Sequence, residues 1–135
     1  MLFRSAAPFS SRLNGVRLSL SGMRFLDLET TGLSGGTGTV AFLATLGRFS
    51  SCDRFTTVQY FMDDYPGEPS LVRRLAADLS EATTVVTYNG GSFDLPLFRT
   101  RCIMNGFRPP EPPRHLDLLV AARRLWRGVL PDCSL

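Results

Sequence analysis

The sequence contains no lysine, one histidine and three widely spaced cysteines. Cys52, Cys102 and Cys133 form no Cys-x-x-Cys pair, so neither a zinc knuckle nor a disulfide framework is indicated, and we expect reduced thiols in a cytoplasmic protein. His115 has no histidine or cysteine partner at ligand spacing, and no nucleophile-elbow motif supports a Ser-His-Asp triad. No apolar run approaches the roughly 20 residues of a membrane-spanning helix, so no membrane partner is expected.

Positive charge comes from arginine alone and is unevenly distributed. Arg4, Arg12 and Arg17 lie in the first 22 residues without an acid, and the other 12 of the 15 basic residues are matched by 12 acidic residues. The net charge therefore resides in the N-terminal segment, and no strongly basic folded face is indicated. A Ser- and Arg-rich segment can be a transit peptide, but we interpret residues 1–22 as a flexible basic tail.

The remaining residues, 23–135, are sufficient for one globular domain, since 44% of the chain is apolar and only 20% is charged. Apolar periodicity and turn residues predict strands at 23–29, 39–49, 54–62, 83–88 and 115–118, and helices at 66–80, 94–105 and 119–126. Three antiparallel strands followed by alternating helices and strands describe an α/β domain. Its mixed β-sheet would carry helices on its faces.

The first chemical signal is a pair of carboxylates at the end of the first predicted strand. Asp27 and Glu29 are two residues apart, so both project from one face of that strand. Neighbouring carboxylates repel each other, and a divalent cation relieves the repulsion, since Mg²⁺ prefers oxygen ligands. The alternative is a pair of solvated acids beside a turn.

The second signal is the segment 89–94, Asn-Gly-Gly-Ser-Phe-Asp, where a buried strand gives way to a helix. In open α/β sheets, ligands gather at the carboxyl ends of strands. Asp94 would lie in the first helical turn, so a plain helix cap is the alternative interpretation. If the two strands are neighbours, Asp27, Glu29 and Asp94 converge and could hold two metal ions about 3.5–4 Å apart.

Several segments, taken in order, resemble one known superfamily. FLDLETTGL resembles the first motif of the DEDD (DnaQ-like) exonucleases, and TYNGGSFDLPLF resembles their second motif. The YprB-like ribonuclease H-like proteins resemble the chain more closely. That resemblance rests on DLETTGLSGGTGTVAFLATLG, the QYF at 59–61, VTYNGGSFDLPL and HLDLLVAARRLW. It covers residues 23–135.

The resemblance implies a ribonuclease H-like fold and a divalent-metal-dependent 3′→5′ exonuclease, a hydrolase acting on the 3′ end of single-stranded DNA or RNA. Asp27, Glu29 and Asp94 match the family's catalytic metal ligands. A complete site would hold two Mg²⁺ or Mn²⁺ ions. The choice between DNA and RNA stays open.

Five further residues are candidates through the same resemblance. Asp117 is a candidate for direct metal binding or for a supporting role around the metal site, with helix capping or another structural role as the alternative. Asn89 is a candidate for a supporting role, with a plain turn at Asn89-Gly90 as the alternative. Thr30, Gly32 and Phe93 are candidate substrate contacts, although Phe93 also suits core packing.

The chain departs from the family after Asp117. The family's last motif is a Tyr or His followed four residues later by an Asp. Here the only later acid is Asp132, and it has no such partner. We therefore expect an exonuclease domain truncated before that motif. The alternative is a catalytically impaired remnant that binds nucleic acid, and a structural or regulatory partner domain with idle acids is a third hypothesis.

Two other segments have simpler interpretations. The glycines at 35–38 lack the GxxxxGK[ST] pattern and precede a strand, so they predict a turn rather than a phosphate loop. Arg123, Arg124 and Arg127 on the last helix predict a solvated face, with phosphate contact as the alternative. Trp126 is expected to pack in the core.

Overall fold

A computed structural model describes residues 19–32, 38–112 and 114–130. The elements in chain order are η2 (Leu20–Gly22), β1 (Met23–Thr30), β2 (Ala41–Phe49), β3 (Phe55–Phe61), η3 (Tyr65–Gly67), α1 (Glu68–Ser80), β4 (Thr84–Thr87), α2 (Asp94–Met104), β5 (His115–Asp117) and α3 (Leu118–Leu125). The predicted order of strands and helices is confirmed, and their bounds agree to within two residues.

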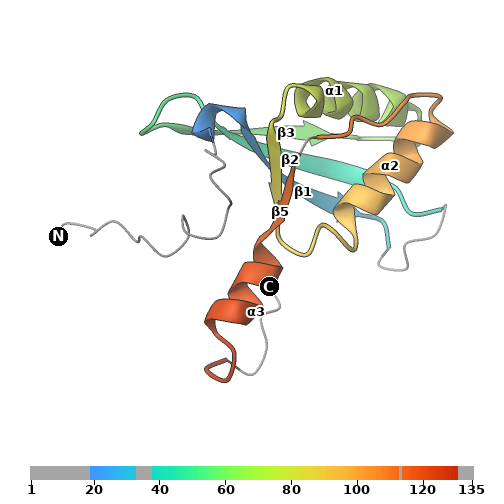
Figure 1. Cartoon of the computed structure of the whole chain (residues 1–135). Coiled ribbons are helices and arrows are strands. Elements are labelled where there is room, and N and C mark those ends of the chain that lie inside the picture. The colour runs from blue at the N-terminus through green and yellow to red at the C-terminus, as the bar shows by residue number, and fades with distance from the viewer. Residues whose placement is uncertain (1–18, 33–37, 113, 131–135) are drawn as a thin grey trace.

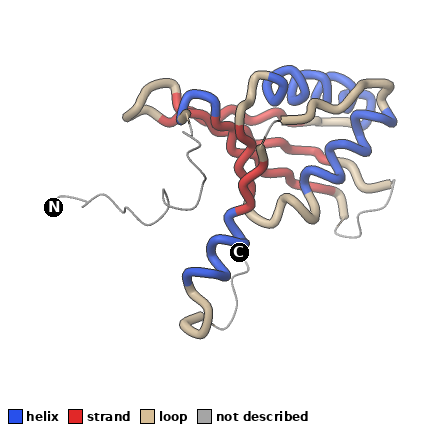
Figure 2. The backbone as a smooth tube through the Cα atoms, viewed as in Figure 1, coloured by secondary structure: helices blue, strands red, loops and turns tan. Residues whose placement is uncertain are grey.

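The described strands form one mixed sheet in the order β3-β2-β1-β4-β5, which Figure 2 shows in red. Pairing is antiparallel between β1 and β2 and between β2 and β3. It is parallel between β1 and β4 and between β4 and β5. The carboxyl ends of β1, β4 and β5 therefore meet at the same edge of the sheet. The condition for convergence of the predicted acids, that β1 and β4 are neighbours, is fulfilled.

The hydrophobic core lies between one face of the sheet and the helices α1 and α2, which lie together in Figure 1. Leu26 and Leu28 contribute to it from β1, while Leu75 from α1 and Cys102 from α2 have no exposed surface. Burial of a large apolar side chain stabilises a fold by roughly 1.5–3 kcal/mol. Since side chains alternate along a strand, this burial turns Asp27 to the opposite face.

A buried ion pair joins the two helices. Both nitrogens of the Arg101 guanidinium that face Glu68, Nε and Nη2, donate to its two carboxylate oxygens. Each residue is 8% exposed. Burial raises the pKa of Glu68, but hydrogen bonds from Arg101 and Asn105 outweigh it, so the pKa lies below its ordinary value. The pair holds α2, the helix that begins at Asp94, against α1.

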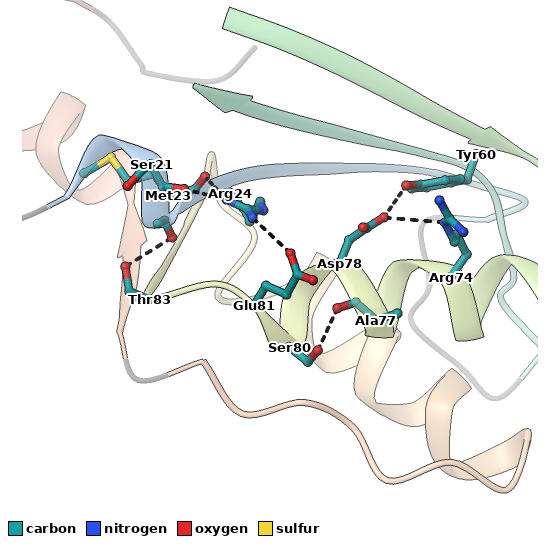
Figure 3. A network of polar contacts seen from close by, with 11 residues as sticks. Ser21, Met23, Arg24, Tyr60, Arg74, Ala77, Asp78, Ser80, Glu81 and Thr83 are labelled. Carbon is teal, nitrogen blue, oxygen red and sulfur yellow. Dashed lines mark hydrogen bonds and ion pairs between the residues drawn. The ribbon is translucent and has the colours of Figure 1, made fainter. Parts of the chain in front are cut away.

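A second polar network holds α1 against the strands (Figure 3). Tyr60 of β3 donates a hydrogen bond to Asp78 of α1, and Arg74 lies 4.0 Å from the same carboxylate. At the start of β1, buried Arg24 lies 3.6 Å from the exposed carboxylate of Glu81. The contact of Asp78 with β3 and the contact of Glu81 with β1 together fix the direction of α1 across the sheet.

A short turn precedes β1. The segment Leu20–Gly22 forms a 3-10 turn, and the backbone N–H of Thr83 donates to the Gly22 carbonyl over 2.9 Å. The last residues of the predicted tail are thus attached to the start of β4, whereas residues 1–18 lie outside the described residues.

Helix α3 extends from the end of β5 away from α1 and α2 (Figures 1 and 2). Leu119 and Ala122 are its buried side chains. Arg123 and Arg124 are exposed, as predicted for a solvated face. Trp126 is 46% exposed, so the prediction that it packs in the core is wrong, because α3 points away from the main core. Within the described ranges, no helix is long and apolar enough to cross a membrane.

Candidate metal and nucleic-acid site

Asp27 and Glu29 lie on the exposed side of β1, close to its carboxyl end, and Leu28 between them turns into the core. The two carboxylates therefore share one face, as the alternation of a strand predicts. The pairing of β1 with β2 shifts register between Glu29 and Thr30. Such a bulge increases the local twist and re-aims side chains, and bulges are frequent beside active sites.

Asp94 lies beside the part of β1 that no longer pairs with β4. The pairing between β1 and β4 ends at Phe25 and Val86. Further along β1, the backbone N–H of Leu28 is hydrogen-bonded to the Asp94 carboxylate. Asp94 lies in the first turn of α2 and is 6% exposed. The helix dipole favours a negative charge at this position.

The electrostatics of Asp94 show that the carboxylate of Asp27 on β1 is close to that of Asp94 on α2. Burial, and next the negative charge of Asp27, raise the pKa of Asp94 to about 6. The hydrogen bond from Leu28 acts in the opposite direction, and the charge of Asp117 adds a smaller increase. Without a cation, Asp94 is therefore partly protonated just below neutral pH.

The loop that leads into α2 has a tightly constrained backbone. Asn89 has a φ of 62°, in the left-handed region that few residues other than glycine adopt. A Cβ atom on Gly90 would lie 2.5 Å from the Cβ of Thr87, so a glycine is required at this position. The Gly90 carbonyl accepts a hydrogen bond from the N–H of Leu95 over 2.9 Å. The loop and the first turn of α2 thus form one unit.

Asp117, at the end of β5, accepts three backbone hydrogen bonds. Its Oδ1 accepts from the N–H of Asn89 (2.8 Å) and of Leu119 (3.0 Å), and its Oδ2 accepts from the N–H of Gly91 (3.1 Å). Burial raises the pKa of Asp117, but these three donors outweigh it and lower the pKa below its ordinary value. The capping alternative is confirmed, because the bond to Leu119 caps α3.

The candidate substrate contacts have different surroundings. Thr30 donates its hydroxyl hydrogen to the Gly32 carbonyl over 3.0 Å, so the two residues close the start of the glycine-rich turn. Residues 33–37 of that turn lie outside the described residues. Phe93 is partly buried and packs against the core, as the alternative interpretation predicted.

Two contacts near the site could not be found by reasoning from the sequence: one made by a backbone N–H group, and one between the side chains of β4 and β5. The N–H of Leu28 reaches Asp94, and the ring Nε2 of His115 lies 2.8 Å from the Thr87 hydroxyl. The latter contact depends on the pairing of β4 with β5, for which the sequence carries no direct signal.

The donor set suits a hard divalent cation. Asp27, Glu29 and Asp94 offer carboxylate oxygens, the ligands that Mg²⁺ and Mn²⁺ prefer. Burial, and next the negative charge of Asp27, raise the pKa of Asp94, and a cation would relieve the repulsion between the two carboxylates. In the described part of the chain, no three His, Cys, Asp or Glu side chains stand close enough to form a ready-made metal cluster.

Comparison with known proteins gives a family match over most of the chain. A model of the RNase_H superfamily matches residues 24–135. The uncharacterized protein YprB of Bacillus subtilis (strain 168) is 39% identical over 113 residues, which are 82% of this chain and 27% of YprB.

Solved structures show the same fold. Exonuclease I of E. coli in a zinc-bound complex with single-stranded DNA has a TM-score of 0.64 at 18% identity, covering 77% of this chain and 29% of the exonuclease. Its complex with a dA16 oligonucleotide gives the same TM-score, identity and coverage. The chain thus spans less than a third of the length of these relatives.

Proposed function

Because the chain belongs to the RNase_H superfamily, we propose that it is a divalent-metal-dependent exonuclease that removes nucleotides from the 3′ end of single-stranded DNA or RNA. One observation carries the proposal. Asp27 and Glu29 on β1 lie at the sheet edge where α2 places Asp94, and the charge of Asp27 raises the pKa of Asp94. A buried carboxylate whose pKa is raised by a neighbouring negative charge, at the carboxyl end of a sheet, is typical of cation sites.

The three carboxylates differ in what they contribute. Asp27 and Glu29 are exposed, so their oxygens are accessible to a cation from solvent. Asp94 is buried and is oriented by the N–H of Leu28, which leaves its remaining lone pairs for a cation. Two divalent ions held by this set would supply the activation of the attacking water and the neutralisation of the leaving oxygen.

The protonation of Asp94 determines when the site accepts a cation. Below pH 6 the proton on Asp94 competes with a metal, because one carboxyl is then neutral. Above pH 6 Asp94 loses this proton and its carboxylate becomes free to bind a cation. We therefore propose that activity rises with pH through about 6.

A single-stranded substrate is supported by the fold likeness to exonuclease I, whose structures contain single-stranded DNA or a dA16 oligonucleotide. Arg123 and Arg124 are exposed on α3, the helix that begins directly after Asp117. Phosphate groups of a bound strand could contact them there. A binding-only function is the second candidate, favoured by the fact that no ready-made three-ligand cluster is found among the described residues.

The decisive experiment is degradation of 5′-labelled single-stranded DNA and RNA in the presence of Mn²⁺, with the wild type and Asp27→Ala compared. We expect stepwise shortening from the 3′ end by the wild type and its loss in the variant. A substrate with a blocked 3′ end should resist, which tests the polarity.

The matched control is Asp53→Asn. Asp53 is exposed in the turn between β2 and β3, at the other end of β2 from the site, so its replacement should leave activity unchanged. Absence of degradation with retained strand binding would support the binding-only function. Degradation that Asp27→Ala retains would exclude the proposed site.

A further inference from the structure

Asp117 connects three backbone segments that carry or flank the site. Its carboxylate binds the N–H groups of Asn89 and Gly91 in the loop after β4, and that of Leu119 in α3. Asp117 itself ends β5, one strand beyond β4. One side chain therefore holds the loop before α2 against the adjacent edge of the sheet.

The loop passes this restraint to Asp94. Gly90, which lies between the two bonded residues, accepts the hydrogen bond of Leu95, and Leu95 directly follows Asp94. Phe93 in turn accepts from the N–H of Leu97 over 3.0 Å, which starts the helical ladder of α2. A displacement of the loop would therefore displace the first turn of α2, and with it the carboxylate that faces Asp27.

The loop has a conformation that needs such a restraint. Asn89 keeps a φ of 62°, in a left-handed region that asparagine tolerates better than other residues with a side chain and that surrounding contacts stabilise further. The 2.8 Å bond from its N–H to Asp117 is one such contact. A Cβ on Gly91 would lie 3.1 Å from the Asp117 carboxylate, so the loop approaches this side chain closely.

The same bonds distinguish Asp117 from the proposed ligands. Both of its oxygens accept backbone N–H groups, and one accepts two of them. A cation at this carboxylate would have to displace donors that already satisfy it. Asp27 and Glu29, by contrast, are exposed.

We propose that Asp117 is a positioning residue: it holds the loop 89–91, and through it the first turn of α2, so that Asp94 stays opposite Asp27, and it does not bind metal itself. The proposal rests on the proposed function for the role of Asp94. The restraint on the loop is a property of the protein without metal and can be tested separately.

Two variants separate the restraint from helix capping. Asp117→Asn keeps an oxygen for Asn89 and Leu119 but turns an amide group toward the N–H of Gly91. Asp117→Ser can still cap α3 but is too short to reach the loop. Asp64→Ala serves as a matched control, because Asp64 caps η3 through the N–H of Tyr65, away from the site.

The first measurement is amide hydrogen exchange of the metal-free proteins. We expect exchange at Gly91 and Leu95 to be faster by about tenfold or more in both Asp117 variants, because a charged acceptor is lost, and unchanged in Asp64→Ala. Exchange at Leu95 that equals that of the wild type would overturn the proposal.

The second measurement is calorimetric titration with Mn²⁺. We expect Asp117→Asn to keep the number of bound ions and to lose affinity by about 10- to 100-fold, as for other groups that orient metal ligands. Loss of one bound ion would instead make Asp117 a ligand and overturn the proposal. If the wild type binds no Mn²⁺, the proposed function fails, and the exchange result alone decides whether Asp117 positions α2.

Discussion

The charge of Asp27 on β1 raises the pKa of Asp94 at the start of α2. The two residues are 67 positions apart in the chain, and the parallel pairing of β1 with β4 brings them to the same sheet edge. The topology of the sheet therefore affects a property that can be measured, the pKa of Asp94.

The coupling predicts that Asp27→Asn lowers the pKa of Asp94 toward its ordinary value. The variant removes a negative charge but keeps the shape of the side chain, so the burial of Asp94 is unchanged. Carboxyl-carbon NMR titration of the metal-free protein measures the shift directly. A pKa of Asp94 that is the same in both proteins would show that the charge of Asp27 does not raise it.

The raised pKa also predicts a pH-dependent effect of Asp94→Asn on stability. The folded protein holds the Asp94 proton up to about pH 6, whereas the unfolded chain releases it near 3.8, so folding loses stability as pH rises between these values. Asparagine cannot ionise and still accepts from Leu28. We expect Asp94→Asn to be about as stable as the wild type at pH 4 and more stable by about 1–3 kcal/mol at pH 7.5.

Urea unfolding of both proteins in EDTA measures this difference. The difference between the two proteins is the relevant quantity, because Glu68 and Asp117 have lowered pKa values and favour folding at higher pH. A difference that does not change with pH would contradict the assignment. Addition of Mn²⁺ should stabilise the wild type at pH 7.5 and should stabilise Asp94→Asn less.

The sequence predicted the elements and the neighbouring acids because both depend on local patterns. The alternation of apolar residues around Asp27 and Glu29 places them on the exposed face of β1, and the residues Asn89 to Gly91 break β4 where the structure ends it. The antiparallel pairing of the first three strands followed from their short connections, whereas the pairing of β1 with β4 was a condition that only the structure fulfils.

Contacts between distant backbone groups could not be predicted in this way. The three N–H bonds of Asp117 and the bond from Leu28 to Asp94 require a known register between strands. The exposure of Trp126 was also missed, because helical periodicity gives the apolar side of α3 but not the direction in which the helix leaves the sheet. The ion pair of Glu68 and Arg101 joins two helices at a spacing that no motif marks.

The tight approach of the loop to β4 predicts that Gly90→Ala destabilises the protein. Its Cβ would lie 2.5 Å from the Cβ of Thr87, a backbone-proximal atom that cannot rotate away. We expect a loss of about 1–3 kcal/mol, as for other overpacked positions, measured by urea unfolding. Gly38→Ala is the control, because a Cβ there meets no atom within 4 Å. Equal stability of the two variants would show that the loop has room to move.

The ion pair between α1 and α2 predicts a large effect for Glu68→Ala. The change leaves the Arg101 guanidinium buried at 8% exposure without its carboxylate, which costs about 3–5 kcal/mol in comparable sites. The effect should be largest near neutral pH, because Glu68 has a lowered pKa and loses its contribution only as pH falls through that value.

Glu81→Ala provides the contrast for this prediction. Glu81 faces buried Arg24, but its own side chain is 70% exposed and the pair is 3.6 Å apart, so its removal should cost less than about 1 kcal/mol. Unfolding by urea at pH 7 and pH 4 compares the two variants. If Glu68→Ala costs no more than Glu81→Ala, then α2 is held by its apolar contacts alone, and the position of Asp94 does not depend on the ion pair.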